Sequence, residues 1–332
     1  MTTNISRRSV LSLASAAAVG AALPFGAQPV FAQSNGVRWA SLAPGFTVLI
    51  TQYIRHFELD KANGFSLGAP TEYTSVPTYY GDFDAGNYDV CIGSWDSFAV
   101  RYLRGVPIKY LCSITTGEMI NFLTTADSGI ASAADLAGKT IAAPQSTGTY
   151  RMARAVLNEF EGVDIESAAT VQNVTNPAAS VSVMRAGSAD AALTWEPNVS
   201  NALAQDSNIQ VLYNVGKSYA SNVGSKLPYF GVAVRAEVLE RDPAIAGKIS
   251  ATFKACIDGI LSNTAEAIQV VGEGTGFEPA VLQEAIESGR LSFEFSSMAD
   301  EAERQVVLDA AEFCVRNELL PGVPDQDYFA QA

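Results

Sequence analysis

The stretch that decides the fold is Asp135–Tyr150, which reads DLAGKTIAAPQSTGTY. Its polar start indicates a turn, and Thr140–Ala143 is a short apolar run of the kind that forms a buried strand. A loop of small residues follows, and Thr149–Glu161 then repeats apolar residues at the spacing of one helix face, as far as Gly162. Because a strand that passes through a short loop into a helix is the unit of α/β proteins, we expect that fold class.

The loop within this stretch has the chemistry of an anion-binding corner. Ser146 or Thr147 is placed to cap the helix, and Gly148 leaves the backbone N–H groups open to a ligand. The positive end of the helix dipole favours a carboxylate, a sulfonate or a ring acceptor there. A capped helix that binds nothing explains the same residues equally well, because every helix start has free N–H groups.

Short apolar runs recur on both sides of this stretch and alternate with segments of helical spacing, which predicts mostly parallel sheets. The predicted strands are Val37–Leu42, Val90–Ile92, Ile108–Ile114, Asn121–Thr124, Thr140–Ala143, Ala191–Trp195, Ile209–Tyr213 and Tyr229–Val234. The other predicted helices run from Thr47 to about Ala62, from Asp242 through Ile260, and from Glu301 to Leu320.

A tryptophan followed by a carboxylate lies at the end of one predicted strand and shortly after the end of another. Ser94-Trp95-Asp96 follows one strand, and Trp195-Glu196 follows another. Open α/β sheets bind ligands beyond the carboxyl ends of their strands, so these loops are candidate ligand contacts. A third strand end, which leads to Phe46, adds an aromatic side chain. Ordinary packing of a buried tryptophan explains one such cluster, but two clusters beside the Ser146 loop favour a site.

Three segments in order resemble one family of transport proteins. They are FDAGNYDVCIGSWDSFAVRYLRGVPIKYL (83–111), DLAGKTIAAPQSTG (135–148) and SADAALTWEP (188–197). Together they look like the periplasmic solute-binding proteins of ABC importers, in the NMT1/THI5-like branch that handles nitrate, sulfonates, taurine and thiamine-pyrimidine precursors. The middle segment is the most specific of the three.

The resemblance implies a type II periplasmic-binding fold with mixed, mostly parallel sheets in two α/β lobes, joined by a hinge of two crossing segments. It places lobe one at residues 36–119 and 226–332 and lobe two at residues 120–225. Solute that bridges the lobes would stabilise a closed form, which an ABC permease with its ATPase recognises. The implied protein is therefore not an enzyme and uses no cofactor or metal. The residues expected at the cleft are Phe46, Ser94, Trp95, Asp96, Gln145, Ser146, Thr147, Trp195, Glu196 and Tyr229.

Composition excludes several other classes of protein. The 332 residues carry 21 basic and 35 acidic side chains, a net charge of −14, which disfavours nucleic acid and anionic membranes as partners. The chain has one histidine, His56, within a predicted helix, so a multi-histidine metal site or a Ser/His/Asp hydrolase is not expected. A pyrimidine-synthase-like enzyme of the same fold is the least favoured alternative, because no cysteine cluster accompanies that histidine.

The N-terminus predicts export. Arg7-Arg8, an apolar stretch over Leu13–Phe25 and small residues up to Ala32 are typical of a twin-arginine signal peptide, residues 1–32. Cleavage after Ala32 leaves 19 basic and 35 acidic residues, a net charge of −16, in a soluble periplasmic chain without a lipid anchor. The four cysteines lie in apolar contexts, which favours buried free thiols over two disulfides.

The candidate ligands fall into two chemical classes. Asp96 and Glu196 can accept hydrogen bonds from an amino group, and the tryptophans offer flat apolar walls. A taurine- or sulfonate-like zwitterion and an amino-heteroaromatic solute such as a thiamine-pyrimidine precursor both fit, whereas nitrate does not, because the three loops lack a basic residue. A monomer is expected, and a sensory binding protein that presents its ligand to a receptor is the alternative role.

Overall fold

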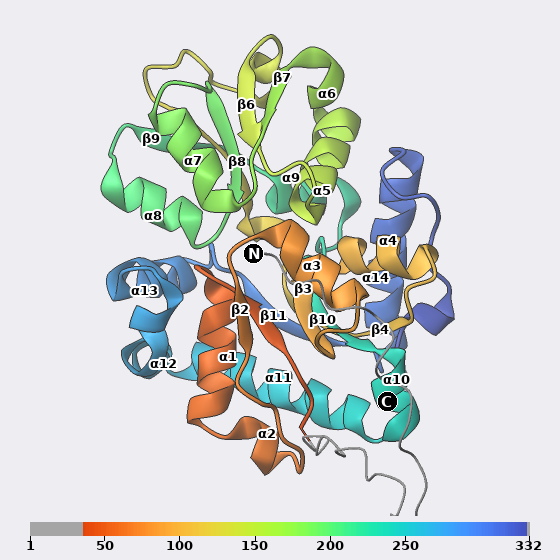
Figure 1. Ribbon diagram of the computed structural model, residues 1–332. Coiled ribbons are helices and arrows are strands. Elements are labelled where there is room, and N and C mark those ends of the chain that lie inside the picture. The colour runs from red at the N-terminus through yellow and green to blue at the C-terminus, as the bar shows by residue number, and fades with distance from the viewer. Residues whose placement is uncertain (1–35, 331–332) are drawn as a thin grey trace, which may run out of the picture. The chain divides into compact units, whose positions relative to one another are not determined.

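The computed structural model describes residues 36–330, apart from the side chains of residues 272 and 273. The predicted signal peptide and its cleavage point lie outside the described residues. Five strands from the middle of the chain form one sheet, in the order β7-β6-β8-β5-β9 (Figure 1). They are β5 (Ile120–Thr125), β6 (Thr140–Ala143), β7 (Thr170–Asn173), β8 (Ala191–Trp195) and β9 (Ile209–Asn214). We call this sheet and its helices the second lobe.

The helices of the second lobe follow its strands in the chain. They are α5 (Gly148–Val156), α6 (Ile165–Ala168), α7 (Pro177–Arg185), α8 (Asn198–Gln205) and α9 (Val215–Val223). Figure 1 shows α7 and α8 on one side of the sheet and α5 and α6 on the other. Apolar side chains of β6 and β8 are fully buried between these layers, as expected for strands covered on both faces.

The first lobe is built from both ends of the described chain. Its main sheet has the order β11-β4-β10-β3, and β1 pairs with β2 beside it. The strands are β1 (Ala40–Leu42), β2 (Thr71–Tyr73), β3 (Val90–Ser94), β4 (Ile108–Thr115), β10 (Phe230–Arg235) and β11 (Phe293–Ser297). The helices are α1 (Phe46–His56), α2 (Leu59–Ala62), α3 (Val76–Asp84), α4 (Trp95–Leu103), α10 (Ala236–Arg241), α11 (Ile245–Ser262), α12 (Thr264–Val271), α13 (Pro279–Glu287) and α14 (Glu301–Arg316).

Two chain segments cross between the lobes and are hydrogen-bonded to each other. One runs from β4 to β5 and the other from α9 to β10. The Gly117 N–H donates to the Leu227 carbonyl at 2.8 Å, and Thr116 forms a bridge with Pro228. The expected fold class, two α/β lobes with mixed sheets and two crossing segments, is confirmed. The exact lobe boundaries remain a proposal.

The expectation that the sheets are mostly parallel is wrong. The pairings among β3, β4, β10 and β11 are antiparallel, and β5 pairs antiparallel with both β8 and β9. Parallel pairing is found for β6 with β7 and β8, and for β1 with β2. The physical reason is the chain path: β5 and β10 enter their sheets directly from the other lobe, so they run against their neighbours.

The predicted strands are all present, and the helix ends differ in detail. The first predicted helix is interrupted at Glu58, whose φ of 50° is left-handed, so α1 and α2 are separate. The last ends at Arg316 rather than Leu320. The sequence patterns missed β2, β7 and β11. The strands β2 and β7 are largely exposed, so they lack the apolar run that marks a buried strand.

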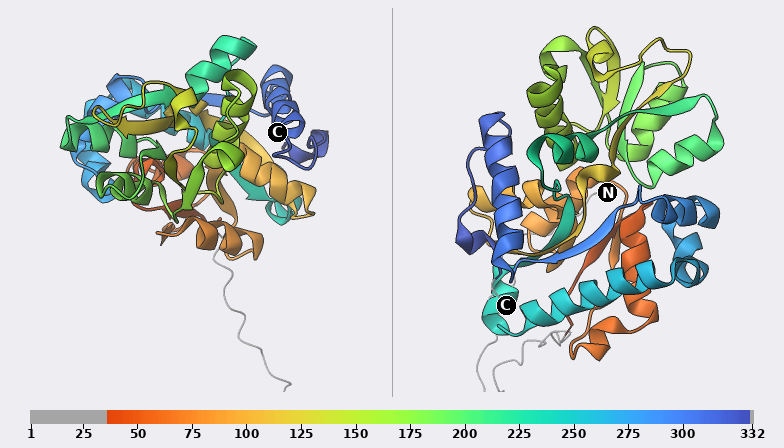
Figure 2. Two further views of the ribbon diagram at one scale, coloured as in Figure 1. Left: turned by 90° about the horizontal axis from the view of Figure 1, so that it is seen from above. Right: turned by 180° about the vertical axis from the view of Figure 1, so that it is seen from behind.

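The C-terminal helix α14 contacts the second lobe as well as the first (Figure 2). The Phe313 ring stacks on Phe160 with 5.6 Å between centroids and meets Tyr219 edge-on at 5.1 Å. Arg316 forms an ion pair with Glu159 at 2.7 Å. Residues assigned by sequence to lobe one therefore contribute contacts to both lobes.

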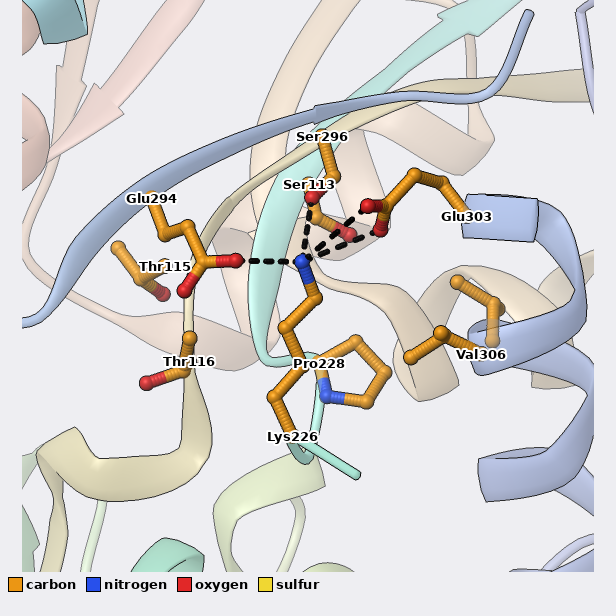
Figure 3. A pocket seen from close by; sticks show the side chains of 10 residues that line it. Ser113, Thr115, Thr116, Lys226, Pro228, Glu294, Ser296, Glu303 and Val306 are labelled. Atoms are coloured by element: carbon orange, nitrogen blue, oxygen red, sulfur yellow. Dashed lines mark hydrogen bonds and ion pairs between the residues drawn. The ribbon is translucent and has the colours of Figure 1, made fainter. Parts of the chain in front are cut away.

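A half-buried lysine, Lys226, ties the second crossing segment to the first lobe (Figure 3). The Lys226 ammonium lies 2.5 Å from Glu294 on β11 and 3.1 Å from Glu303 on α14, and it donates to the Ser296 hydroxyl at 2.8 Å. Burial by itself lowers the pKa of Lys226, but the two carboxylates outweigh burial and raise it. Lys226 thus connects the second crossing segment to both β11 and α14.

Replacing Lys226 with Met should lower the free energy of unfolding by about 1–3 kcal/mol, because it leaves two facing carboxylates without their shared cation. Urea unfolding measures this change. Lys254→Met is the matched control, because its pair with Asp258 is more than half exposed and contributes about 0.5 kcal/mol or less. Equal losses in both variants would contradict the role of Lys226.

Candidate functional site

A small cavity of about 20 Å³ lies between the lobes, where several strands end and helices begin. That is room for a single water molecule or little more, so the lobes are in close contact around it. None of its lining residues carries a formal charge. They are Leu42, Val76, Tyr79, Tyr80, Ile92, Ser94 and Phe230 from the first lobe and Thr147, Gly148, Thr149 and Trp195 from the second.

The starts of α4 and α5 face each other beside this cavity. Thr147 caps α5 by accepting a hydrogen bond from the Tyr150 N–H at 3.3 Å. Ser94 precedes α4, and its hydroxyl is 2.8 Å from that of Ser97. A Cβ at Gly148 would lie 1.9 Å from Asp96 Oδ1 and 2.4 Å from Ser94 Oγ. Only a glycine lets the two helix starts approach this closely.

An ion pair joins the same two helices. Arg151 on α5 donates to Asp96 Oδ2 at 2.6 Å and to the Ser97 hydroxyl at 2.7 Å. The Asp96 side chain is 1% exposed, and its other oxygen, Oδ1, has no hydrogen-bond partner in the described part of the chain. In this ion pair the first lobe thus supplies the carboxylate and the second lobe supplies the arginine.

A second ion pair joins the lobes with the opposite polarity. Glu196 follows β8 in the second lobe and is fully buried, and Arg290 of the first lobe donates to its Oε1 at 3.2 Å. The Ser200 N–H and hydroxyl also donate to this carboxylate, at 3.1 and 3.0 Å. Burial raises the pKa of the Glu196 carboxyl to about 7 and Glu284 adds to this, although Ser200 and Arg290 act in the opposite direction.

Of the residues expected at the cleft, Ser94, Thr147 and Trp195 line the cavity. Asp96 lies directly behind Ser94 and Gly148, and Glu196 lies in the second ion pair. The Tyr229 hydroxyl is hydrogen-bonded to the lining residue Thr149. These side chains come together as a group, and their contact with a ligand remains a prediction.

The other four expected residues do not line the cavity. The Phe46 ring packs edge-on against Phe230, with 5.0 Å between centroids. Trp95 is fully buried, and its carbonyl accepts a hydrogen bond from Tyr328. Gln145 is half-buried and Ser146 is exposed in the loop before α5.

Sequence reasoning missed the two arginines of the interlobe ion pairs. Arg151 lies one helical turn after Thr147, so its position on the helix was a usable signal. Arg290 is far along the chain, and no local pattern links it to Glu196. Tyr79 and Tyr80 also line the cavity, although neither is among the residues expected from the sequence.

The described residues show no group of three or more His, Cys, Asp or Glu side chains placed to hold a metal ion. The four cysteines are free and buried. Among the helices of residues 36–330, none has the length and apolarity needed to cross a bilayer.

Comparison with known families identifies the chain. The model of the family described as NMT1/THI5 like matches residues 67–240, more than half of the chain. The chain belongs to the NMT1/THI5-like family. No curated protein matches the sequence significantly.

Solved structures share the fold of this NMT1/THI5-like protein. The aliphatic sulphonate binding protein SsuA from Escherichia coli is 18% identical, with a TM-score of 0.69 over 89% of this chain and 91% of that one. The alkanesulfonate-binding protein SsuA from Xanthomonas axonopodis pv. citri, bound to MOPS, is 18% identical, with a TM-score of 0.71 over 87% and 95%. A Candida albicans protein with the generic periplasmic binding protein fold is 15% identical, with a TM-score of 0.63 over 88% and 93%. At these identities the likeness shows the fold alone, which is the periplasmic binding protein fold.

Gly148→Ala should hold the lobes apart, because the added methyl group overlaps Asp96 and Ser94. We expect a larger radius of gyration by small-angle X-ray scattering than for the wild type. Gly81→Ala is the control, since this exposed helix position has open space around it and the radius should not change. Equal radii for the wild type and Gly148→Ala would contradict the close contact.

The stability contributed by Glu196 should fall as pH rises. Its folded-state pKa of about 7 lies above the ordinary value of 4.5, so the contribution is full below about pH 4.5 and is lost as pH rises through 7. The unfolding free energy of the wild type relative to Glu196→Gln should therefore drop by on the order of 3 kcal/mol across this window, measured by urea unfolding.

Glu159 supplies a control of opposite sign. The hydrogen bond from Arg316 lowers the pKa of Glu159, so its contribution is present above the unfolded pKa and is lost as pH falls. The unfolding free energy of the wild type relative to that of Glu159→Gln should therefore increase as pH rises. The same slope for both residues would refute the environment assigned to Glu196.

Proposed function

We propose that this protein is the substrate-binding component of an ABC importer, which captures a small organic solute between its lobes and delivers it to a membrane permease and its ATPase. The observation that carries the proposal is the interlobe cavity, to which both lobes contribute side chains. Binding sites of small molecules typically lie at such boundaries, with apolar walls and a few polar groups.

The two ion pairs provide the means of closure. Arg151 meets Asp96 and Arg290 meets Glu196 only when the lobes come together, so both pairs belong to the closed form. A solute that touches both lobes binds a closed form, with the lobes slightly further apart around the cavity than here, more tightly than an open one and shifts the population toward it. The permease then recognises the closed form. No bond is made or broken, so the protein acts by binding and not as an enzyme.

The solute we propose is a sulfonate-like zwitterion such as taurine, or an amino-heteroaromatic compound such as a thiamine-pyrimidine precursor. Trp195, Phe230 and Tyr80 give the cavity aromatic walls, while Ser94 and Thr149 add hydroxyl groups. The similar structures that bind sulfonates support the first class, and membership of the family supports the second. The cavity in this closed form is smaller than either solute, so the lobes must open to admit one.

We further propose that the protein is exported to the periplasm through the twin-arginine translocase and works there as a soluble monomer. The Arg7-Arg8 motif, the apolar stretch after it and the absence of a nearby cysteine in the sequence support this route.

A thermal-shift screen tests the proposed function. The mature chain from Gln33 is unfolded and refolded to remove any carried solute, then heated with taurine, alkane- and arylsulfonates, aminopyrimidines, aromatic carboxylates and nitrate. A solute at 100 times its Kd should raise the melting temperature by about 5 °C, because it binds the native state alone. We expect this rise for an amino-bearing sulfonate or heteroaromatic compound and not for nitrate.

Two variants show whether the rise comes from the cavity. Trp195→Ala removes a wall and should abolish the shift, whereas Leu261→Ala, on an exposed part of α11, should keep it. A panel with no shift at all would overturn solute capture as proposed here.

A further inference from the structure

One oxygen atom beside the cavity lacks a partner. The Asp96 side chain is 1% exposed. Its Oδ2 accepts a hydrogen bond from Arg151, which also donates to Ser97. Its Oδ1 accepts no hydrogen bond from any described residue. A buried acceptor left unpaired is costly, and more so when it carries charge. Such a group in a binding protein points to a ligand donor that completes it.

The position of Oδ1 puts it within reach of a bound solute. It adjoins Gly148 at the start of α5 and Ser94 at the end of β3, and both of these residues line the cavity. A modest separation of the two helix starts would bring Oδ1 to the cavity, because Oδ1 adjoins the lining residue Gly148. The same separation is needed to admit a solute.

The charges around the cavity favour a hydrogen-bond donor of the solute over an anionic group at Asp96 Oδ1. The lining residues carry aromatic rings, aliphatic groups and hydroxyls but no formal charge. The guanidinium of Arg151 does not line the cavity, and its charge is already paired with Asp96. The positive ends of α4 and α5 would attract an anion, but Asp96 already places a carboxylate between them and would repel it.

We propose that Asp96 determines the specificity of the site by accepting a hydrogen bond from an amino group of the solute at Oδ1. Arg151 acts as the positioning residue that holds the carboxylate through Oδ2. The solute class is then a small molecule with an ammonium or aromatic amino group attached to a body that packs against Trp195 and Phe230. This inference rests on the proposed function and narrows its ligand.

Matched pairs of probes that differ by one amino group test the inference. Taurine is compared with ethanesulfonate, and 4-aminopyrimidine with pyrimidine, by calorimetric titration of the refolded mature protein. The amino member of at least one pair should bind the wild type at least tenfold more tightly than its partner. This comparison needs no variant and so does not depend on how any substitution folds.

Asp96→Asn then assigns the preference to this residue. The ratio of affinities within the pair should fall to within about twofold of unity, because the carboxylate charge is lost and an amide NH2 that stands in place of Oδ1 cannot accept a hydrogen bond. Glu196→Gln is the control: it weakens the other interlobe ion pair, so both members of a pair should lose affinity equally and their ratio should persist.

The outcomes separate the inference from the proposed function. Equal binding of both members to the wild type, or a preference that survives Asp96→Asn, overturns the role of Asp96 while solute capture stands. If neither these probes nor any solute of the thermal-shift panel binds, the proposed function fails and the inference fails with it.

Discussion

The close contact between the starts of α4 and α5 is the constraint on which the closed arrangement depends. Gly148 allows it sterically, since any side chain there would overlap Ser94 and Asp96. Two helix starts that face each other bring two positive dipole ends together in a site with little water. The Asp96 carboxylate lies between them and offsets that repulsion. The contact therefore needs a glycine on one lobe and an acid on the other.

The path of the chain explains how the lobes can move and still return to this contact. The crossing segments bond to each other through Gly117 and Leu227, and Lys226 ties one of them to the first lobe. The helix α14 then leaves the first lobe and packs on the second through Phe313. In the solute capture proposed above, the paired crossing segments would act as the hinge, and α14 is a further contact between the lobes.

The two ion pairs across the cleft are reciprocal, because each lobe offers one arginine and one carboxylate. Burying such pairs contributes less to stability than the short distances suggest, since both charges lose their hydration. Their main effect is to define one closed geometry. In the solute capture proposed above, ion pairs that contribute little net stability would leave the bound solute to decide between open and closed forms.

Much of the framework followed from local sequence patterns. Apolar runs predict buried strands such as Thr140–Ala143 and Ala191–Trp195. The cap residue and the apolar periodicity predict the helix after Thr147. These signals depend on neighbours in the chain, so the alternation of strands and helices and the loop before α5 were predictable. The exposed strand β7 was not, because its residues face solvent and carry no apolar pattern.

The sequence by itself determined the α/β class, eight of the strands and the loops that supply Ser94, Thr147 and Trp195. Only the tertiary structure decided that β5 and β10 run antiparallel, that Trp95 turns into the core, and that Arg151 and Arg290 reach across the cleft. The reason is that these features arise where segments from the two lobes meet. Contacts between residues as far apart as Glu196 and Arg290 depend on how the lobes pack, and no periodicity along the chain records that.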